Sequence, residues 1–212
     1  MRFCILGIMA ILSVVTTGAL VAEEAEDAAP FLEKVKAEQY SSTNRFLVEE
    51  YMYRLPQNTG YKHEIWLVLA SDASKRKLLF THERAAEVLF SEDDHWIGIN
   101  NRFCSTDAGV IFFRKKNGMD FEQVDDITER SWEFFAKQTK SNAGFDHSYV
   151  EILRWTDSRT VLLCLHGHGD GHRYLEDWLC LYDVNTKTFS TDLDGHNKKH
   201  TVLEDEVPVK PK

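Results

Sequence analysis

The sequence predicts an all-β protein, mainly antiparallel strands and hairpins, with one or two short helices. Two observations lead to this class. From residue 45 onward, short runs rich in aromatic and β-branched side chains alternate with clusters of Gly, Asn, Asp, Ser and Pro. Such alternation is expected of strands joined by turns. Apolar residues at helical spacing are confined to two segments, 31–40 and 125–140.

The N-terminus has the residue order of a secretory signal peptide. Arg2 precedes an apolar run that is followed by small residues and then, from Glu23, by an acidic stretch. We expect cleavage after Ala22, with Ala19 as the alternative. The apolar run is shorter than the roughly 20 residues that span a bilayer, which favours a cleaved signal over a membrane anchor. The predicted product is exported, periplasmic or extracellular, and has no membrane span.

Cleavage would leave one domain-sized chain with an acidic surface. Of 212 residues, 190 remain, and the loss of Arg2 changes the formal net charge from −9 to −10. This length suits a single domain. An acidic surface repels phosphate backbones, and no cluster of Lys and Arg interleaves with aromatics, so we expect no nucleic-acid partner.

The mature chain is expected to begin with a linker at 23–30, continue as a single β-rich domain at 31–203 and end in a disordered tail at 204–212. Pro30 suits the first turn of a short amphipathic helix over 31–40. Strands are predicted at 45–55, 63–70 and 77–80, with a turn at 56–60 and a loop at 71–76 between them. Residues 81–87 are undecided between a helical turn and a connector. An edge strand is predicted at 201–203.

Two later segments resemble each other. Residues 88–102 and 152–166 each consist of an apolar run, a polar turn and a second apolar run. Each is followed by a further strand and, after an Asn-containing turn, by a short final strand. These following segments are 109–118 and 121–124 in the first copy, and 174–189 and 188–190 in the second.

This unit resembles a blade of the β-propeller family. In such blades an S-x-D-G-x-W-type turn links two strands. The two copies are 65 residues apart, against roughly 40–50 in regular blades. The resemblance implies a propeller-like array of blades, and a β-sandwich with two unrelated hairpins is the alternative. The matching residues are Ser91, Asp93 and Trp96, with Asp94 where Gly is common, and in the second copy Thr156, Asp157 and Val161.

A helix is predicted over 125–140, between the two copies. Asp126 and Glu129 have the spacing of a capping box, and Trp132 and Phe135 fall on one helical face. An aromatic stripe of this kind is typical of core packing. We therefore expect the helix to cover a face or an edge of a sheet.

The stretch 161–184 predicts two antiparallel strands joined by a loop rich in Gly and His. If the strands fold symmetrically about His172, Cys164 lies opposite Cys180 and both faces are largely apolar, as in a central hairpin. Facing cysteines at a non-hydrogen-bonded pair come within reach of a disulfide. A Cys164–Cys180 disulfide is therefore one expectation, and two buried free thiols are the other.

The loop of this hairpin carries the candidate metal ligands. Residues two apart on a strand project to the same side. His166 and His168 therefore point together, and Asp170 and His172 join them if the loop stays extended. Paired imidazoles with a nearby carboxylate suit Zn²⁺, which is the candidate cofactor. A solvated Gly/His turn without a specific ligand is the alternative.

The string LLCLHGHGDGH is also similar to the H-x-H-x-D-H metal-binding motif of the metallo-β-lactamase superfamily. His166, His168 and Asp170 match that motif, but Gly171 intervenes before His172. A predicted strand, not a helix, follows. The resemblance covers seven residues and implies a metal ion that activates water.

No complete catalytic constellation is present in the sequence, and no catalytic residue is predicted. The G-x-S-x-G elbow, the P-loop, H-E-x-x-H and the EF-hand loop are all missing. The leading hypothesis is an exported, non-enzymatic β-sheet domain whose loops bind a protein, a glycan or a small ligand. A metal-dependent hydrolase or metal-binding protein that uses the hairpin loop is the competing hypothesis, and a purely structural or regulatory partner is the third.

Overall fold

A computed structural model describes residues 32–34, 39–55, 60–141, 144–169 and 173–194. The predicted signal peptide, linker, C-terminal edge strand and tail lie outside these residues. Within them, no helix combines the length and the apolar character needed to cross a membrane. The elements are β1 (Leu32–Lys34), β2 (Gln39–Tyr40), β3 (Phe46–Arg54), β4 (Tyr61–Leu69), β5 (Asp72–His82), β6 (Ala85–Phe90), β7 (Trp96–Arg102), β8 (Asp107–Asn117), β9 (Asp120–Asp126), α1 (Thr128–Thr139), β10 (His147–Trp155), β11 (Thr160–Gly169), β12 (Arg173–Asp183) and β13 (Thr188–Ser190).

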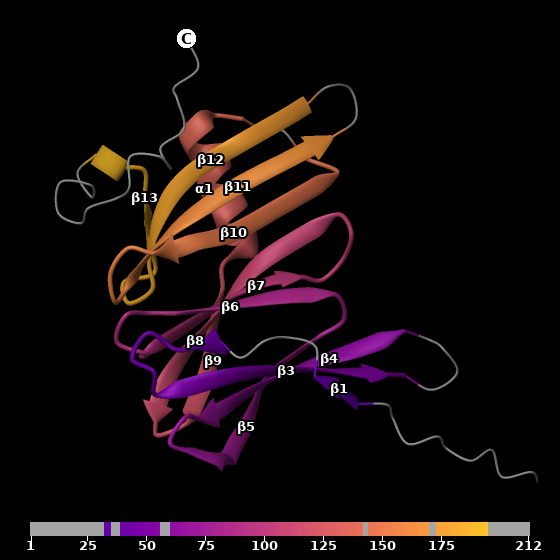
Figure 1. Cartoon of the computed structure of the whole chain (residues 1–212). Coiled ribbons are helices and arrows are strands. Elements are labelled where there is room, and N and C mark those ends of the chain that lie inside the picture. Colours follow the sequence, from indigo (N-terminus) through magenta and orange to yellow (C-terminus); the bar gives the residue numbers. More distant parts are fainter. Residues whose placement is uncertain (1–31, 35–38, 56–59, 142–143, 170–172, 195–212) are drawn as a thin grey trace, which may run out of the picture.

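The strands form three antiparallel meanders, which follow one another along the molecule (Figure 1). The first meander is β3–β4–β5, with β1 and β2 both paired to β3; the second is β6–β7–β8–β9; the third is β10–β11–β12–β13. A short parallel pairing of β8 with β10 joins the second and third meanders into one eight-stranded sheet. The predicted fold class, all-β and mainly antiparallel, is confirmed.

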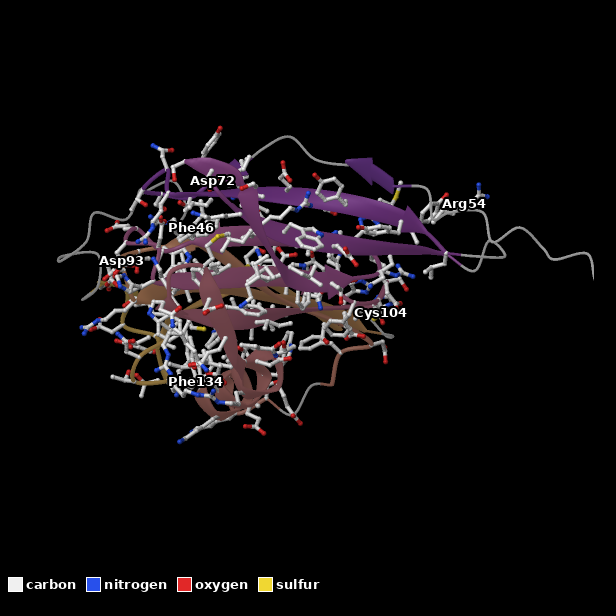
Figure 2. All side chains as sticks on the ribbon, turned by 90° about the horizontal axis from the view of Figure 1, so that it is seen from below. Phe46, Arg54, Asp72, Asp93, Cys104 and Phe134 are labelled. Atoms are coloured by element: carbon white, nitrogen blue, oxygen red, sulfur yellow. The ribbon has the colours of Figure 1, made fainter. Side chains whose placement is uncertain are left out.

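Two hydrophobic clusters fill the spaces between the meanders, and Figure 2 shows their side chains. The cluster between the first and second meanders contains Phe46 and Ile97, neither of which is exposed. The cluster between the second and third contains Phe112 and Tyr182, whose rings stack at 5.7 Å. Helix α1 adds Phe135 to this second cluster. The helix and its role in core packing were predicted correctly.

One turn recurs in each meander, between β2 and β3, between β6 and β7 and between β10 and β11. Its first copy was missed from the sequence. The backbone N–H of Ser41 donates to the carbonyl of Phe46 at 2.9 Å, and that of Ser91 donates to the carbonyl of Trp96 at 3.0 Å. In both turns the serine hydroxyl accepts a hydrogen bond from the residue five positions later. The third copy is shorter and runs from Thr156 to Thr160.

In the first two copies, the fourth residue of the turn has a left-handed backbone conformation, which explains the residue types found there. Asn44 and Asp94 occupy equivalent places and have φ angles of 57° and 55°. Asn and Asp tolerate this conformation better than other non-glycine residues, so Asp94 replaces the glycine of the blade motif. The first two copies of the turn therefore share both their hydrogen bonds and their backbone conformation. A propeller ring is not confirmed by the described strands, which form one five-stranded and one eight-stranded sheet.

Three local predictions are wrong. The helix expected over 31–40 is replaced by β1 and β2, which bond to the edge of β3 because a short isolated helix is only marginally stable in water. The loop expected at 71–76 belongs to β5, an edge strand. The capping box is absent, because Asp126 ends β9 and accepts a hydrogen bond from the N–H of Thr128.

Candidate functional site

The hairpin β11–β12 places the predicted metal ligands at one end of the sheet. His166 and His168 lie near the C-terminal end of β11, where they pair with Tyr149 and His147 of β10, respectively. His166 is partly buried and His168 is exposed. Asp170 and His172 lie outside the described residues, so the predicted set of four ligands stays a prediction.

Both histidines are stacked on rings of the neighbouring strand. The ring centroids of His166 and Tyr149 are 4.8 Å apart, and those of His168 and His147 are 4.1 Å apart. These stacks hold the imidazoles against β10. Between them, a side chain at Gly167 would place its Cβ 2.8 Å from Phe145. Packing against Phe145, and not only loop freedom, therefore requires glycine at this position.

Cys164, His166 and Asp177 bring three potential ligand atoms together. One ligand atom from each residue lies within 4.8 Å of the other two. The Cys164 thiol donates a hydrogen bond of 3.5 Å to Asp177, whose φ of 36° is unusual for a residue with a side chain. Burial, followed by the charge of Asp177, raises the pKa of Cys164 to about 12. The thiol is therefore protonated at neutral pH and is not an activated nucleophile.

The register of this hairpin differs from the predicted one by one residue. Cys164 pairs with Leu179 and Cys180 pairs with Leu163. Because side chains alternate along a strand, the two cysteines project to opposite faces. All three cysteines of the described residues are free thiols. The geometry that favoured a Cys164–Cys180 disulfide is wrong, and the alternative of two buried thiols describes the structure.

A second cluster, formed by Glu50, His63 and His82, was not found from the sequence. The Nδ1 atom of His63 lies 3.0 Å from Oε1 of Glu50, and the Nε2 atom of His82 lies 3.4 Å from the same oxygen. The two imidazole rings stack with centroids 4.8 Å apart. The contacts with His82 and His63 lower the pKa of the Glu50 carboxyl, against the opposing effect of burial.

A pocket of about 300 Å³ opens at the opposite end of the meanders. Figure 2 shows this separation, since Asp93 lies at one end of the strands and Cys104, close to β10, lies at the other. The pocket is built mainly by the repeated turns of the second and third meanders. Its lining consists of Asp93, His95, Trp96, Arg114, Lys115, Ser158, Arg159 and Asn185.

No family model matches the sequence, and no curated protein matches it. Among solved structures, the acylaminoacyl peptidase of Pyrococcus horikoshii is similar with a TM-score of 0.43 and 13% identity. The match covers 76% of this chain and 24% of that protein, so this chain spans about a quarter of its length. At this level of similarity the activity of that protein is not carried over to this chain.

Proposed function

We propose that this chain is an exported, non-enzymatic β-sheet protein that binds a small anionic ligand in the pocket between the repeated turns. The pocket carries three cationic side chains, Arg114, Lys115 and Arg159, on a chain whose formal net charge is −9. A local concentration of positive charge on an otherwise acidic protein attracts anions to that part of the surface. The single observation that carries the proposal is the unpaired ammonium group of Lys115.

The three cations differ in how they are neutralised. Arg114 lies 2.8 Å from Glu122, and Arg159 lies 3.4 Å from Asp183. Lys115 makes no ion pair with any described residue; its ammonium lies over the ring of Phe46, 4.9 Å from the centroid. Burial and the nearby Arg45 lower its pKa, against the smaller opposing effects of the Asp94 and Asp93 carboxylates. A carboxylate or phosphate in the pocket would supply a direct ion pair for this ammonium group.

The same lining argues against catalysis. His95 lies 3.1 Å from Asp93, as an oriented base would, and Ser158 faces the same pocket. A serine nucleophile needs a hydrogen bond to its base. Among the described residues no hydrogen bond joins Ser158 to His95. Binding is therefore the better account of this arrangement.

The test of the pocket is calorimetric titration of the purified mature protein with inorganic phosphate and, separately, with citrate. We expect at least one of these anions to bind, and its affinity to fall at least tenfold in Lys115→Gln. Lys75→Gln is the matched control, because Lys75 is exposed, pairs with Asp72 and does not line the pocket. Binding of neither anion, or equal binding by Lys115→Gln, would exclude this function.

Export has its own test, which is N-terminal sequencing of protein recovered outside the cytoplasm of its native host. The proposal predicts a chain that begins at Glu23, or at Leu20 if the alternative site is used. A chain that retains residues 1–22 would contradict the proposed cleavage.

Metal binding at the β11–β12 hairpin is the second candidate function, and the convergence of Cys164, His166 and Asp177 favours it. Thiolate, imidazole and carboxylate are all ligands of Zn²⁺. Metal analysis of the mature protein and of the double variant His166→Ala/His168→Ala tests it. Zinc retained in full by the double variant would exclude this hairpin as the binding site.

A further inference from the structure

Three adjacent strands of the first meander deliver the Glu50–His63–His82 cluster. His63 of β4 lies directly opposite His82 of β5. Glu50 of β3 is the diagonal neighbour of His63, because the register pairs Met52 with His63 and Glu50 with Ile65. All three side chains therefore stand on the same face, and that face is the one that contributes Phe46 and Ile65 to the core.

The cluster is buried, and it contains no Lys or Arg. The side chains of Glu50, His63 and His82 are 11%, 12% and 1% exposed. A buried carboxylate requires hydrogen bonds or a counter-charge. Here His63 supplies one hydrogen bond at 3.0 Å. The remaining partner is His82, which reaches ion-pair distance without hydrogen-bond geometry.

His82 is the unexplained member of the cluster. Neither of its ring nitrogens has a hydrogen-bond partner among the described residues, although the side chain is almost completely buried. Buried polar atoms are normally satisfied, and leaving one unpaired is costly. The ring is also held in place by Phe80, which stacks on it at 6.2 Å. A fixed and buried imidazole whose one close polar contact is the Glu50 carboxylate, at 3.4 Å, has nitrogen atoms available for a further ligand.

The distances in the cluster suit a small divalent ion. One oxygen of Glu50 lies 3.0 Å and 3.4 Å from the two imidazole nitrogens. Ligand atoms bound tetrahedrally at about 2.0–2.1 Å from Zn²⁺ are separated from one another by roughly 3.3 Å. The rings are stacked and inclined by 26°, so the imidazoles would have to rotate out of the stack to direct both nitrogens at one ion. Two imidazoles and one carboxylate form a known donor set for zinc.

A pocket lies beside one member of this cluster. His82 also lines a pocket of about 230 Å³, together with Tyr61, Lys62, Thr81 and Glu83. A metal site with three protein ligands keeps one position for water or for an exogenous ligand. The pocket beside His82 provides the space for that position. The cluster therefore has the ligands, the burial and the access that such a site needs.

We propose that Glu50, His63 and His82 form a binding site for a divalent transition metal, with Zn²⁺ as the ion that the donor set fits best. The site belongs to the first meander. It does not depend on the anion pocket, and its success or failure leaves that proposal unchanged. It is distinguished from the hairpin proposal by which variants lose the ion.

The experiment is equilibrium dialysis of the tag-free mature protein against Zn²⁺, with metal analysis and, in parallel, a Co²⁺ titration that records visible absorption bands. Two groups of variants are compared. His63→Gln, His82→Gln and Glu50→Gln each remove one proposed ligand, and His166→Ala/His168→Ala removes the alternative site. We expect the ligand variants to weaken Zn²⁺ binding at least tenfold and to lose the bands of four-coordinate Co²⁺, whereas the hairpin variant keeps one metal per chain.

The stability of the variants is controlled separately. His63 is more exposed than His82, so His63→Gln is the variant of choice if His82→Gln does not fold. Circular dichroism confirms that each tested variant is folded, and Mg²⁺ serves as the control ion because it prefers oxygen ligands. Failure of the wild-type protein to bind Zn²⁺, or full binding by folded His63→Gln and Glu50→Gln, overturns the proposal.

Discussion

The hydroxyl of Ser41 donates a hydrogen bond of 2.7 Å to the carboxylate of Asp94, 53 residues further along the chain. Both residues are almost completely buried. Each belongs to a copy of the same turn, so the bond ties the first meander to the second. The hydroxyl of Thr43 donates to the same carboxylate.

Asp94→Ala is expected to destabilise the protein by about 2–3 kcal/mol, because the Ser41 hydroxyl loses a charged acceptor in a buried position. Alanine also tolerates φ = 55° less well than aspartate. Urea unfolding measures the effect. Glu92→Ala is the control, since Glu92 is an exposed residue of the same turn. Equal midpoints for the two variants would show that the Ser41–Asp94 bond is not stabilising.

Gly98→Ala is expected to cost about 1–3 kcal/mol through overpacking. A Cβ at this position would lie 2.3 Å from Ile152 and 3.2 Å from Phe112, between the second and third meanders. Gly144→Ala is the matched control, because a Cβ there would meet nothing within 4 Å. Thermal unfolding of both variants tests the prediction. A melting temperature for Gly98→Ala equal to that of the control would mean that the two layers are not packed as described.

The three thiols of the described residues, Cys104, Cys164 and Cys180, are expected to differ in reactivity. Burial raises the pKa of Cys180 to about 12, as it does for Cys164, whereas Cys104 is partly exposed. Iodoacetamide at pH 8 should therefore modify Cys104 first in the native protein, and all three thiols after unfolding without reductant. Peptide mass spectrometry identifies the modified residues. A count of one thiol in the unfolded protein would restore the disulfide hypothesis.

Stability is expected to fall as the pH rises above about 9. The unfolded Cys180 thiol loses its proton near its ordinary pKa of 9.0, whereas the folded one keeps it up to about 12. Between these values the folded state binds more protons, so this thiol alone lowers the free energy of unfolding by up to about 1.4 kcal/mol per pH unit, and Cys164 adds a similar contribution. Burial, followed by the hydrogen bond to Asp125, also raises the pKa of Tyr182, which extends the decline beyond pH 10.

Cys180→Ala provides the comparison for this pH dependence. The variant is less stable at pH 7 because a buried side chain is shortened. Its free energy of unfolding should nevertheless fall less steeply between pH 9 and pH 11, and urea titrations at several pH values measure both slopes. Parallel slopes for wild type and variant would show that Cys180 does not contribute.

Strands could be predicted from the sequence where apolar and polar residues alternate or where the strand contains a long apolar run. The second and third meanders were found in this way, since residues such as Ile97, Phe112 and Leu163 belong to continuous apolar runs. Strand β5 was only partly found, because residues 73–78 are all exposed and give no pattern with a period of two. The first copy of the turn was missed because Asn44 and Phe46 replace the residues that mark the blade motif.

The candidate sites were harder to predict because they depend on register. A bulge between Leu165 and Gly167 shifts the pairing of β11 with β12, and a shift of one residue moves a side chain to the other face. That shift separates Cys164 from Cys180. The Glu50–His63–His82 cluster has no local spacing at all, since its members come from three strands. Only the long-range pairing of β3, β4 and β5 brings them together.

The order of the meanders along the chain has a consequence for how the protein is assembled. Strands pair almost entirely with strands next to them in sequence, and the parallel contact of β8 with β10 spans only two residue pairs. Local pairing of this kind favours rapid folding. During synthesis, every strand of the first meander is present once His82 has been added to the chain. Glu50, His63 and His82 can therefore meet before the second meander is synthesised, so a metal ion bound there would act as a nucleus for the layers that follow.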